Sequence, residues 1–195
     1  MRKTILRHMV LSGMLVAALF VSAAPVWAAG LTPEEQEHLV FMREEEKLAR
    51  DVYSILYETW GSLVFSNIAG SEQRHMDALL RLLVKYGIPD PAPPQIGAFN
   101  DPKLQELYGQ LVRQGQASLL DAMKAGAMIE EVDIKDLRMA IDDTSRTDLR
   151  RVYGNLERGS GNHLMTFVSH IEAISGERYV AQFLTQDEVD EILGR

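Results

Sequence analysis

The chain has 195 residues, with 28 Asp and Glu against 20 Lys and Arg, no Cys, and a formal net charge of −8 at pH 7. This length suits one domain with a substantial hydrophobic core. The acidic balance argues against nucleic acid and anionic lipid as partners. The lack of Cys excludes disulfides, thiolate metal sites and thiol nucleophiles, so any stabilising metal must be held by oxygen and nitrogen.

The first residues have the three-part layout of a secretory signal peptide. A basic start, "MRKTILRH", precedes the apolar run "MVLSGMLVAALFVSAA", and Val26 and Ala28 provide small residues for cleavage after Ala28. We therefore predict a signal peptide over 1–28 and an exported protein, periplasmic or secreted, with no membrane attachment after cleavage. The alternative is a retained anchor, because the apolar run is nearly long enough to span a membrane.

Helical periodicity dominates the rest of the chain, and strand signals are scarce. Thr32 and Glu35 flank Pro33 in a capping box that opens the first helix. A short helix is expected from Pro102, and Thr185 caps another that ends near residue 193. Long helices are expected at about 33–59, 66–86, 117–141 and 146–175. The sequence thus predicts an all-α fold.

The links between the long helices indicate how the helices are connected. A short link joins the first helix to the second, and another joins the third to the fourth, so each of these pairs should be antiparallel neighbours. The Pro-rich segment 88–101 separates the second helix from the third. One long crossover in the middle is the connectivity of a ferritin-like four-helix bundle. We expect a single such domain over 29–195, with its core at about 33–175.

Each long helix has an apolar line, traced in steps of three and four residues, that a carboxylate or imidazole interrupts near its middle. None of these lines contains Lys or Arg. Midpoints of bundled helices meet in one layer, so the interrupting residues should converge. They are Glu46, Glu72, His75, Glu130 and His163.

Convergence of these groups predicts a bound cation. Each unpaired buried charge costs several kcal/mol, and three such carboxylates would consume most of the ~5–15 kcal/mol net stability of a typical domain. Oxygen and imidazole ligands without sulfur suit Fe, Mn or Zn. The alternatives are core polar residues relieved by protonation or basic partners, or a first helix rotated by one residue, which would put Glu45 in place of Glu46.

The spacing of Glu72 and His75 is compatible with a site for two ions. Residues three apart share a helix face, so the imidazole can bind one ion while the carboxylate bridges two. Bridged cations can share an oxygen-derived ligand, as dioxygen or peroxide activation requires. Tyr53 follows Glu46 by two turns, and we expect a core aromatic bonded to a ligand carboxylate, with a redox-active phenol as the alternative.

Four blocks stand in order along the chain: "REEEKLARDVY", "NIAGSEQRHM", "GAMIEEVDIKDL" and "GSGNHLMTF". The first contains Glu46, Ala49 and Tyr53 in the Glu-x-x-Ala-x-x-x-Tyr pattern, and the second contains the Glu-x-x-His of Glu72 and His75. These blocks resemble the ferritin-like di-iron carboxylate superfamily, which includes rubrerythrins and ferritins. They are most similar to a branch known as domain of unknown function family 2202, and the resemblance covers about 33–174.

This resemblance implies a non-haem di-iron or di-manganese site with oxidase, peroxidase or ferroxidase chemistry, and it favours Glu46 over Glu45. One departure is clear, because Ser160 stands where a second Glu-x-x-His motif ending at His163 would have Glu. Asp133 or Glu131 could supply the missing carboxylate. Alternatively, one metal position is weak or empty and the site is mononuclear.

The sequence therefore predicts an exported metal-binding bundle that holds one or two Fe or Mn ions and reacts with oxygen or peroxide. Electrons would come from a separate, unidentified donor, since no Cys-rich electron-transfer module is present. We expect a monomer or homodimer. Two alternatives stay open: a metal site without catalysis, and a metal-free helical module that binds a partner in the cell envelope.

Overall fold

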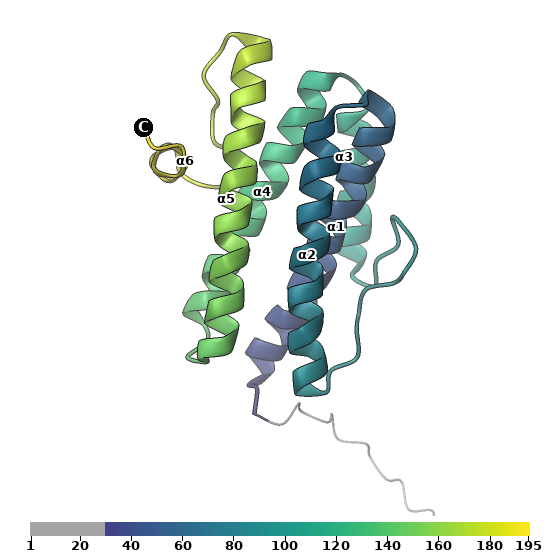
Figure 1. Cartoon of the computed structure of the whole chain (residues 1–195), viewed down its shortest axis with the longest axis vertical. Coiled ribbons are helices and arrows are strands. Elements are labelled where there is room, and N and C mark those ends of the chain that lie inside the picture. Colours follow the sequence, from purple (N-terminus) through teal and green to yellow (C-terminus); the bar gives the residue numbers. More distant parts are fainter. Residues whose placement is uncertain (1–29) are drawn as a thin grey trace, which may run out of the picture.

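The computed structural model describes residues 30–195, and these residues form six helices and no strand (Figure 1). The helices are α1 (Pro33–Trp60), α2 (Leu63–Tyr86), α3 (Pro102–Gly115), α4 (Leu119–Asp142), α5 (Thr147–Ser175) and α6 (Gln186–Ile192). The predicted all-α bundle is confirmed. The predicted signal peptide, 1–28, lies outside the described residues and stays a prediction.

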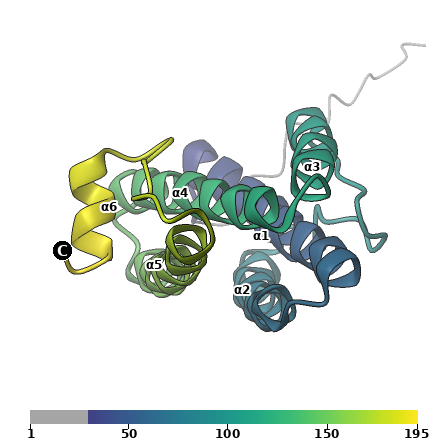
Figure 2. The same cartoon turned by 90° about the horizontal axis from the view of Figure 1, so that it is seen from above.

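The four long helices pair as two hairpins. α1 packs along α2, and α4 packs along α5. The hairpins meet through α1 against α4 and, more loosely, through α2 against α5, as the end-on view shows (Figure 2). The crossover and α3 return the chain along the bundle, so that α4 runs in the same direction as α2 (Figure 1). The long central crossover predicted from the Pro-rich segment is therefore present.

The helix ends follow the sequence signals, with one difference at the start of α2. The Thr32–Glu35 capping box is present in full, and Gly61 and Gly87 end α1 and α2 in the left-handed conformation. α2 begins at Leu63, three residues before the expected position. Phe65 explains the difference, because this ring is fully buried among core aromatics and draws the first turn into the bundle.

The hydrophobic core is divided into two clusters. One contains Leu39, Leu79 and Leu156, and the other contains Leu56, Phe65 and Phe167. Between them, along the bundle axis, lies a layer of buried carboxylates and imidazoles from all four long helices. This polar layer lies at the midpoints of the long helices, where a carboxylate or imidazole interrupts the apolar line of each helix.

The two buried cations of α1 face the crossover and not this polar layer. Lys47 donates to Asp51 at 2.5 Å and to the carbonyl oxygen of Gln95 at 2.8 Å. Arg43 forms an ion pair of 2.7 Å with Asp90. These contacts hold residues 88–101 against α1. Among the described helices, none has a stretch both apolar enough and long enough to cross a bilayer.

Candidate metal centre

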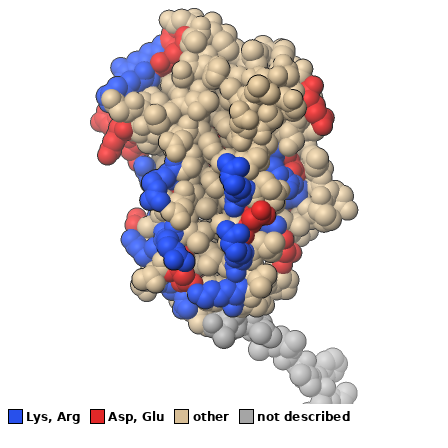
Figure 3. Space-filling model, viewed as in Figure 1, with Lys and Arg blue, Asp and Glu red and all other residues tan. Residues whose placement is uncertain are grey.

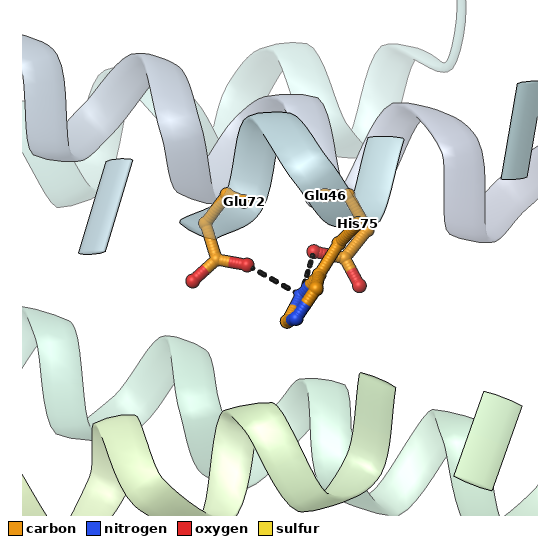
Figure 4. A group of neighbouring side chains, drawn as sticks. All are labelled: Glu46, Glu72 and His75. Carbon is orange, nitrogen blue, oxygen red and sulfur yellow. Dashed lines mark hydrogen bonds and ion pairs between the residues drawn. The ribbon is translucent and has the colours of Figure 1, made fainter. Parts of the chain in front are cut away.

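Each long helix contributes to the polar layer. Glu46 comes from α1, Glu72 and His75 from α2, Glu130 from α4 and His163 from α5. The three carboxylate residues are each 1% exposed, while the His75 and His163 side chains are 12% and 11% exposed. Figure 4 shows Glu46, Glu72 and His75 pointing together into the space between the two hairpins. The predicted convergence is confirmed.

The five residues form two groups that share Glu72. Nδ1 of His75 lies 2.8 Å from Oε2 of Glu72 and 3.2 Å from Oε2 of Glu46. Nδ1 of His163 lies 2.8 Å from Oε1 of Glu72 and 3.4 Å from Oε2 of Glu130. In each group the candidate ligand atoms lie within 4.8 Å of one another. The two oxygens of Glu72 thus face different groups, as in a bridging carboxylate.

Several of these buried atoms lack hydrogen bonds although they are close together. Nδ1 of His163 and Oε1 of Glu72 are 2.8 Å apart, yet both are buried without a hydrogen-bond partner, as is Oε1 of Glu46. Buried polar atoms are rarely left unsatisfied, because each costs roughly 1–3 kcal/mol. Nitrogen and oxygen atoms that converge in this way fit the ligand preferences of Fe, Mn or Zn.

The electrostatics show how the group is neutralised when no cation is bound. Burial, with added repulsion from Asp133 and Glu72, raises the pKa of Glu46 well above its ordinary value, and burial also raises the pKa of Glu130. Burial opposes the charge of His163, but Glu130 and Glu72 outweigh it and raise its pKa to about 10. Protons therefore occupy the group, and a cation would displace them.

Glu72 has the opposite shift. Burial raises its pKa, but its contacts with His163 and His75 outweigh burial and lower the pKa to about 2. Within the described residues, the ion pairs of Glu46, Glu72 and Glu130 involve histidine alone, with no Lys or Arg. Histidine protons, and not Lys or Arg, therefore balance the charge of these carboxylates, and a bound cation could replace those protons.

Comparison with known proteins places this geometry in a family. An uncharacterized protein domain, DUF2202, matches residues 35–195. The chain belongs to the DUF2202 family. Uncharacterized protein MJ0754 of Methanocaldococcus jannaschii is 49% identical over 164 residues, which span 84% of this chain and 88% of the relative. The crystal structure of hypothetical protein MJ0754 from Methanococcus jannaschii covers 85% of this chain and 94% of that chain, with 48% identity and a TM-score of 0.82.

Tyr53 of this DUF2202 domain is a core aromatic bonded to the site, as predicted. Its hydroxyl donates to Oε1 of Glu130 at 2.5 Å, and its ring centroid lies 5.3 Å from that of Phe167 and 6.4 Å from that of Phe65. The residue is fully buried. Tyr53 therefore fixes the orientation of Glu130, which leaves Oε2 of that carboxylate toward His163.

Asp133 is the candidate that fills the place opened by Ser160. The hydroxyl of Ser160 donates to Oδ2 of Asp133 at 2.5 Å, and both residues are buried. Oδ1 of Asp133 has no hydrogen-bond partner, and repulsion from Asp133 contributes to the raised pKa of Glu46. A carboxylate from α4 thus reaches the layer where the α5 helix of this DUF2202 domain carries a small hydroxyl.

The prediction of Glu131 as a replacement ligand is wrong. Its oxygens accept hydrogen bonds from the Tyr179 hydroxyl at 2.7 Å and from the backbone N–H groups of Gln182, Phe183 and Leu184. Glu131 therefore faces the α5–α6 connection and not the site. The α-helical period explains this, since adjacent residues point about 100° apart.

Glu45 is also placed away from the two groups, so the rotated alternative is wrong and Glu46 is the α1 residue at the centre. Glu45 is 5% exposed and faces Asp136 of α4.

One residue that sequence reasoning missed is Gly159. A Cβ atom there would lie 2.6 Å from Nε2 of His75, so the glycine makes room for the imidazole. The sequence signal that could have identified Gly159 is its position next to Ser160, which lies on the inward-facing line of α5.

Proposed function

We propose that this DUF2202 protein is a ferritin-like, non-haem protein that holds two Fe or Mn ions and reacts with peroxide or oxygen. The ligands are Glu46, Glu72 and His75 for one ion, and Glu72, Glu130 and His163 for the other. The observation that carries the proposal is the shared Glu72, whose two oxygens face separate histidines at 2.8 Å each. The proposed location is outside the cytoplasm, and reducing electrons come from a separate donor.

Charge balance supports two ions over one. Glu46, Glu72, Glu130 and Asp133 carry four negative charges when ionised, and two divalent cations neutralise them with both histidines uncharged. A single divalent ion leaves two buried negative charges, each costing several kcal/mol unless protonated. Asp133, with its unpartnered Oδ1, completes the set in place of the missing α5 glutamate.

When bound, such ions supply Lewis acidity and exchangeable electrons. The chain provides the rest. Tyr53 holds Glu130 through its 2.5 Å hydrogen bond, and the two clusters of apolar side chains keep bulk water from both ends of the layer. Of the five proposed ligands, the histidines on α2 and α5 have the more exposed side chains, at 12% and 11%. A reactant that approaches there must be small, which suits peroxide or oxygen.

The experiment loads the metal-free protein anaerobically with Fe(II) and then adds peroxide or oxygen. The proposal predicts rapid oxidation of about two Fe(II) per chain, with consumption of the oxidant faster than by free Fe(II). Glu72→Gln should abolish both the binding of a second ion and the accelerated reaction, whereas Glu157→Gln, which alters a half-buried carboxylate paired with Arg138, should leave them unchanged. Two tightly bound ions without any accelerated reaction would refute the catalytic part.

A second candidate function is metal binding without catalysis. The observation that favours it is Ser160, whose hydroxyl bonds to Asp133 where a second Glu-x-x-His motif would have a carboxylate. In this case chelator treatment lowers the melting temperature and Glu72→Gln abolishes that effect, but oxidants react no faster than with free metal. The same loading experiment therefore separates the two functions.

A further inference from the structure

Two surfaces approach the proposed metal centre, and they have opposite charge. On the α2/α5 face, a groove of about 430 Å³ is lined by Arg81, Lys85 and Arg151 above an apolar floor. Figure 3 shows Lys and Arg gathered over the lower half of this face. Lys85 pairs with Asp148 at 2.6 Å, but among the described residues no carboxylate forms an ion pair with Arg81 or Arg151. The excess of basic side chains in this groove disfavours the approach of metal cations.

The other approach is a cleft on the α1/α4 side, close to the start of α3. It has a volume of about 510 Å³ and contains a single histidine, His38, which is paired with Asp143 at 3.0 Å. The rest of the lining is acidic and apolar, with no Lys or Arg. The acidic residues that line the cleft are Glu34, Glu37, Glu44, Asp101 and Asp136.

Two of these carboxylates, Glu44 and Asp101, accept hydrogen bonds from the backbone and so stabilise the fold. Glu44 accepts hydrogen bonds from the backbone N–H groups of Asn100 and Asp101 at 2.6 and 3.2 Å, and so holds the crossover. Asp101 caps α3 by accepting from the backbone N–H of Lys103 at 2.7 Å. Asp136, which also lines the cleft, accepts no backbone hydrogen bond among the described residues.

Glu45 lies behind Asp136. Burial, with added repulsion from Asp133 and Asp136, raises the pKa of Glu45 well above its ordinary value, so these three carboxylates lie close together. Glu45 is 5% exposed, and its Oε2 is buried without any hydrogen-bond partner. Oδ1 of Asp133, next in line toward Glu46, is likewise unpartnered. A row of carboxylates therefore runs from the cleft into the polar layer.

We propose that Glu45 and Asp136 form a transit site that passes divalent metal cations from the α1/α4 cleft to the buried centre. This inference rests on the proposed metal centre and adds the route by which it is filled. An unpaired buried carboxylate is costly by itself, but it lowers the barrier for a cation that has lost its water shell. The cleft concentrates cations at the mouth, as clefts of one charge do. Glu45 then offers the first oxygen inside the protein.

The test measures the rates of Co²⁺ binding and release with the metal-free, signal-free protein. Stopped-flow absorbance follows binding at low ionic strength, and excess chelator drives release. Because a transit group lowers one barrier for both directions, Glu45→Gln and Asp136→Asn should each slow binding and release by about tenfold, in line with the gain in local cation concentration that a charged cleft provides. The dissociation constant should change less than threefold.

Matched controls separate the route from general charge effects. Asp77→Asn removes an exposed carboxylate of α2 that accepts a hydrogen bond from Gln73, and Arg81→Gln alters the basic groove; neither should slow Co²⁺ binding. Unchanged rates in Glu45→Gln would overturn the transit site while leaving the metal centre in place. Faster release with weaker binding would overturn it too, by making Glu45 a ligand. Failure of the unaltered protein to bind Co²⁺ would refute both the centre and the route.

Discussion

The hydroxyl of Ser160 lies 2.5 Å from Oδ2 of Asp133, across the contact between α5 and α4. This bond orients a carboxylate whose other oxygen, Oδ1, is buried and unpartnered. In the proposed centre, Asp133, one turn away from Glu130 on α4, would supply the carboxylate that α5 lacks. The ligand set would then be complete in charge, although the second Glu-x-x-His motif is incomplete in sequence.

Asp133→Asn should reduce the number of tightly bound Fe or Mn ions from two toward one. The amide has nearly the same shape but removes one of the four charges that balance two divalent ions. Elemental analysis after native purification measures this directly. Ser160→Ala, which removes only the orienting hydrogen bond, should keep two ions with weaker affinity. Equal stoichiometry in Asp133→Asn and the unaltered protein would exclude Asp133 from the site.

Gly159→Ala should weaken metal binding because the new Cβ atom, 2.6 Å from Nε2 of His75, displaces that imidazole. Gly161→Ala is the matched control, since its Cβ would meet Ile192 at an ordinary 3.7 Å. Both changes favour the helix by up to about 1 kcal/mol. Calorimetric titration should therefore show a loss of affinity only in Gly159→Ala. Equal affinities would mean that His75 has no fixed position at the centre.

The metal-free protein should lose stability as the pH rises. Burial raises the pKa of Glu46, Glu130 and Asp133, so the folded protein retains protons that the unfolded chain has lost above about pH 4. The pKa of His163, raised to about 10, adds stability below about pH 6.5 that is lost toward pH 10. The melting temperature of chelator-treated protein should fall between pH 6 and 9. A rise over this range would contradict the assigned shifts.

Loading of that protein with metal should release protons. At neutral pH the imidazolium of His163, whose pKa is raised to about 10 by Glu130 and Glu72 against the effect of burial, must be deprotonated to bind an ion, and the raised pKa values of Glu46 and Asp133 favour further release. Release of at least one proton per chain is therefore expected. Titrations of Co²⁺ in buffers of different ionisation enthalpy give this number. Binding without proton release would show that the ions are held elsewhere.

Glu131→Gln should destabilise the fold without changing the metal content. The carboxylate of Glu131 accepts hydrogen bonds at Oε2 from three consecutive backbone N–H groups and at Oε1 from the Tyr179 hydroxyl, and an amide can accept at only one of these two positions. A loss of about 3 kcal/mol in unfolding free energy is expected, measured by urea denaturation of the metal-free form. The number of bound ions should stay at two. A drop to one would return Glu131 to the list of ligands.

Much of the fold could be predicted from the sequence because its signals are local. Capping boxes, glycine ends and the Pro-rich crossover gave the helix bounds, and regular apolar lines gave the layer in which Glu46, Glu72 and His163 meet. The early start of α2 was missed because it depends on Phe65, which packs against rings from other helices.

The roles of neighbouring carboxylates could not be resolved in the same way. Glu130, Glu131 and Asp133 lie within one turn of α4, and the helical period alone allowed either of the last two at the centre. The structure separates them because residues 179–184 wrap against Glu131, a contact between segments almost 50 residues apart. Gly159 makes room for His75, which lies on another helix, so its role depends on helix packing.

The account depends on two ions bridged by Glu72, and anomalous diffraction tests this most directly. Crystals of the protein loaded with Fe or Mn are measured above and below the absorption edge of the metal. The account predicts two anomalous peaks in the layer between the hydrophobic clusters, one beside His75 and one beside His163, with the Glu72 carboxylate between them. A single peak would contradict the two-ion centre, and peaks confined to the protein surface would contradict the metal site itself.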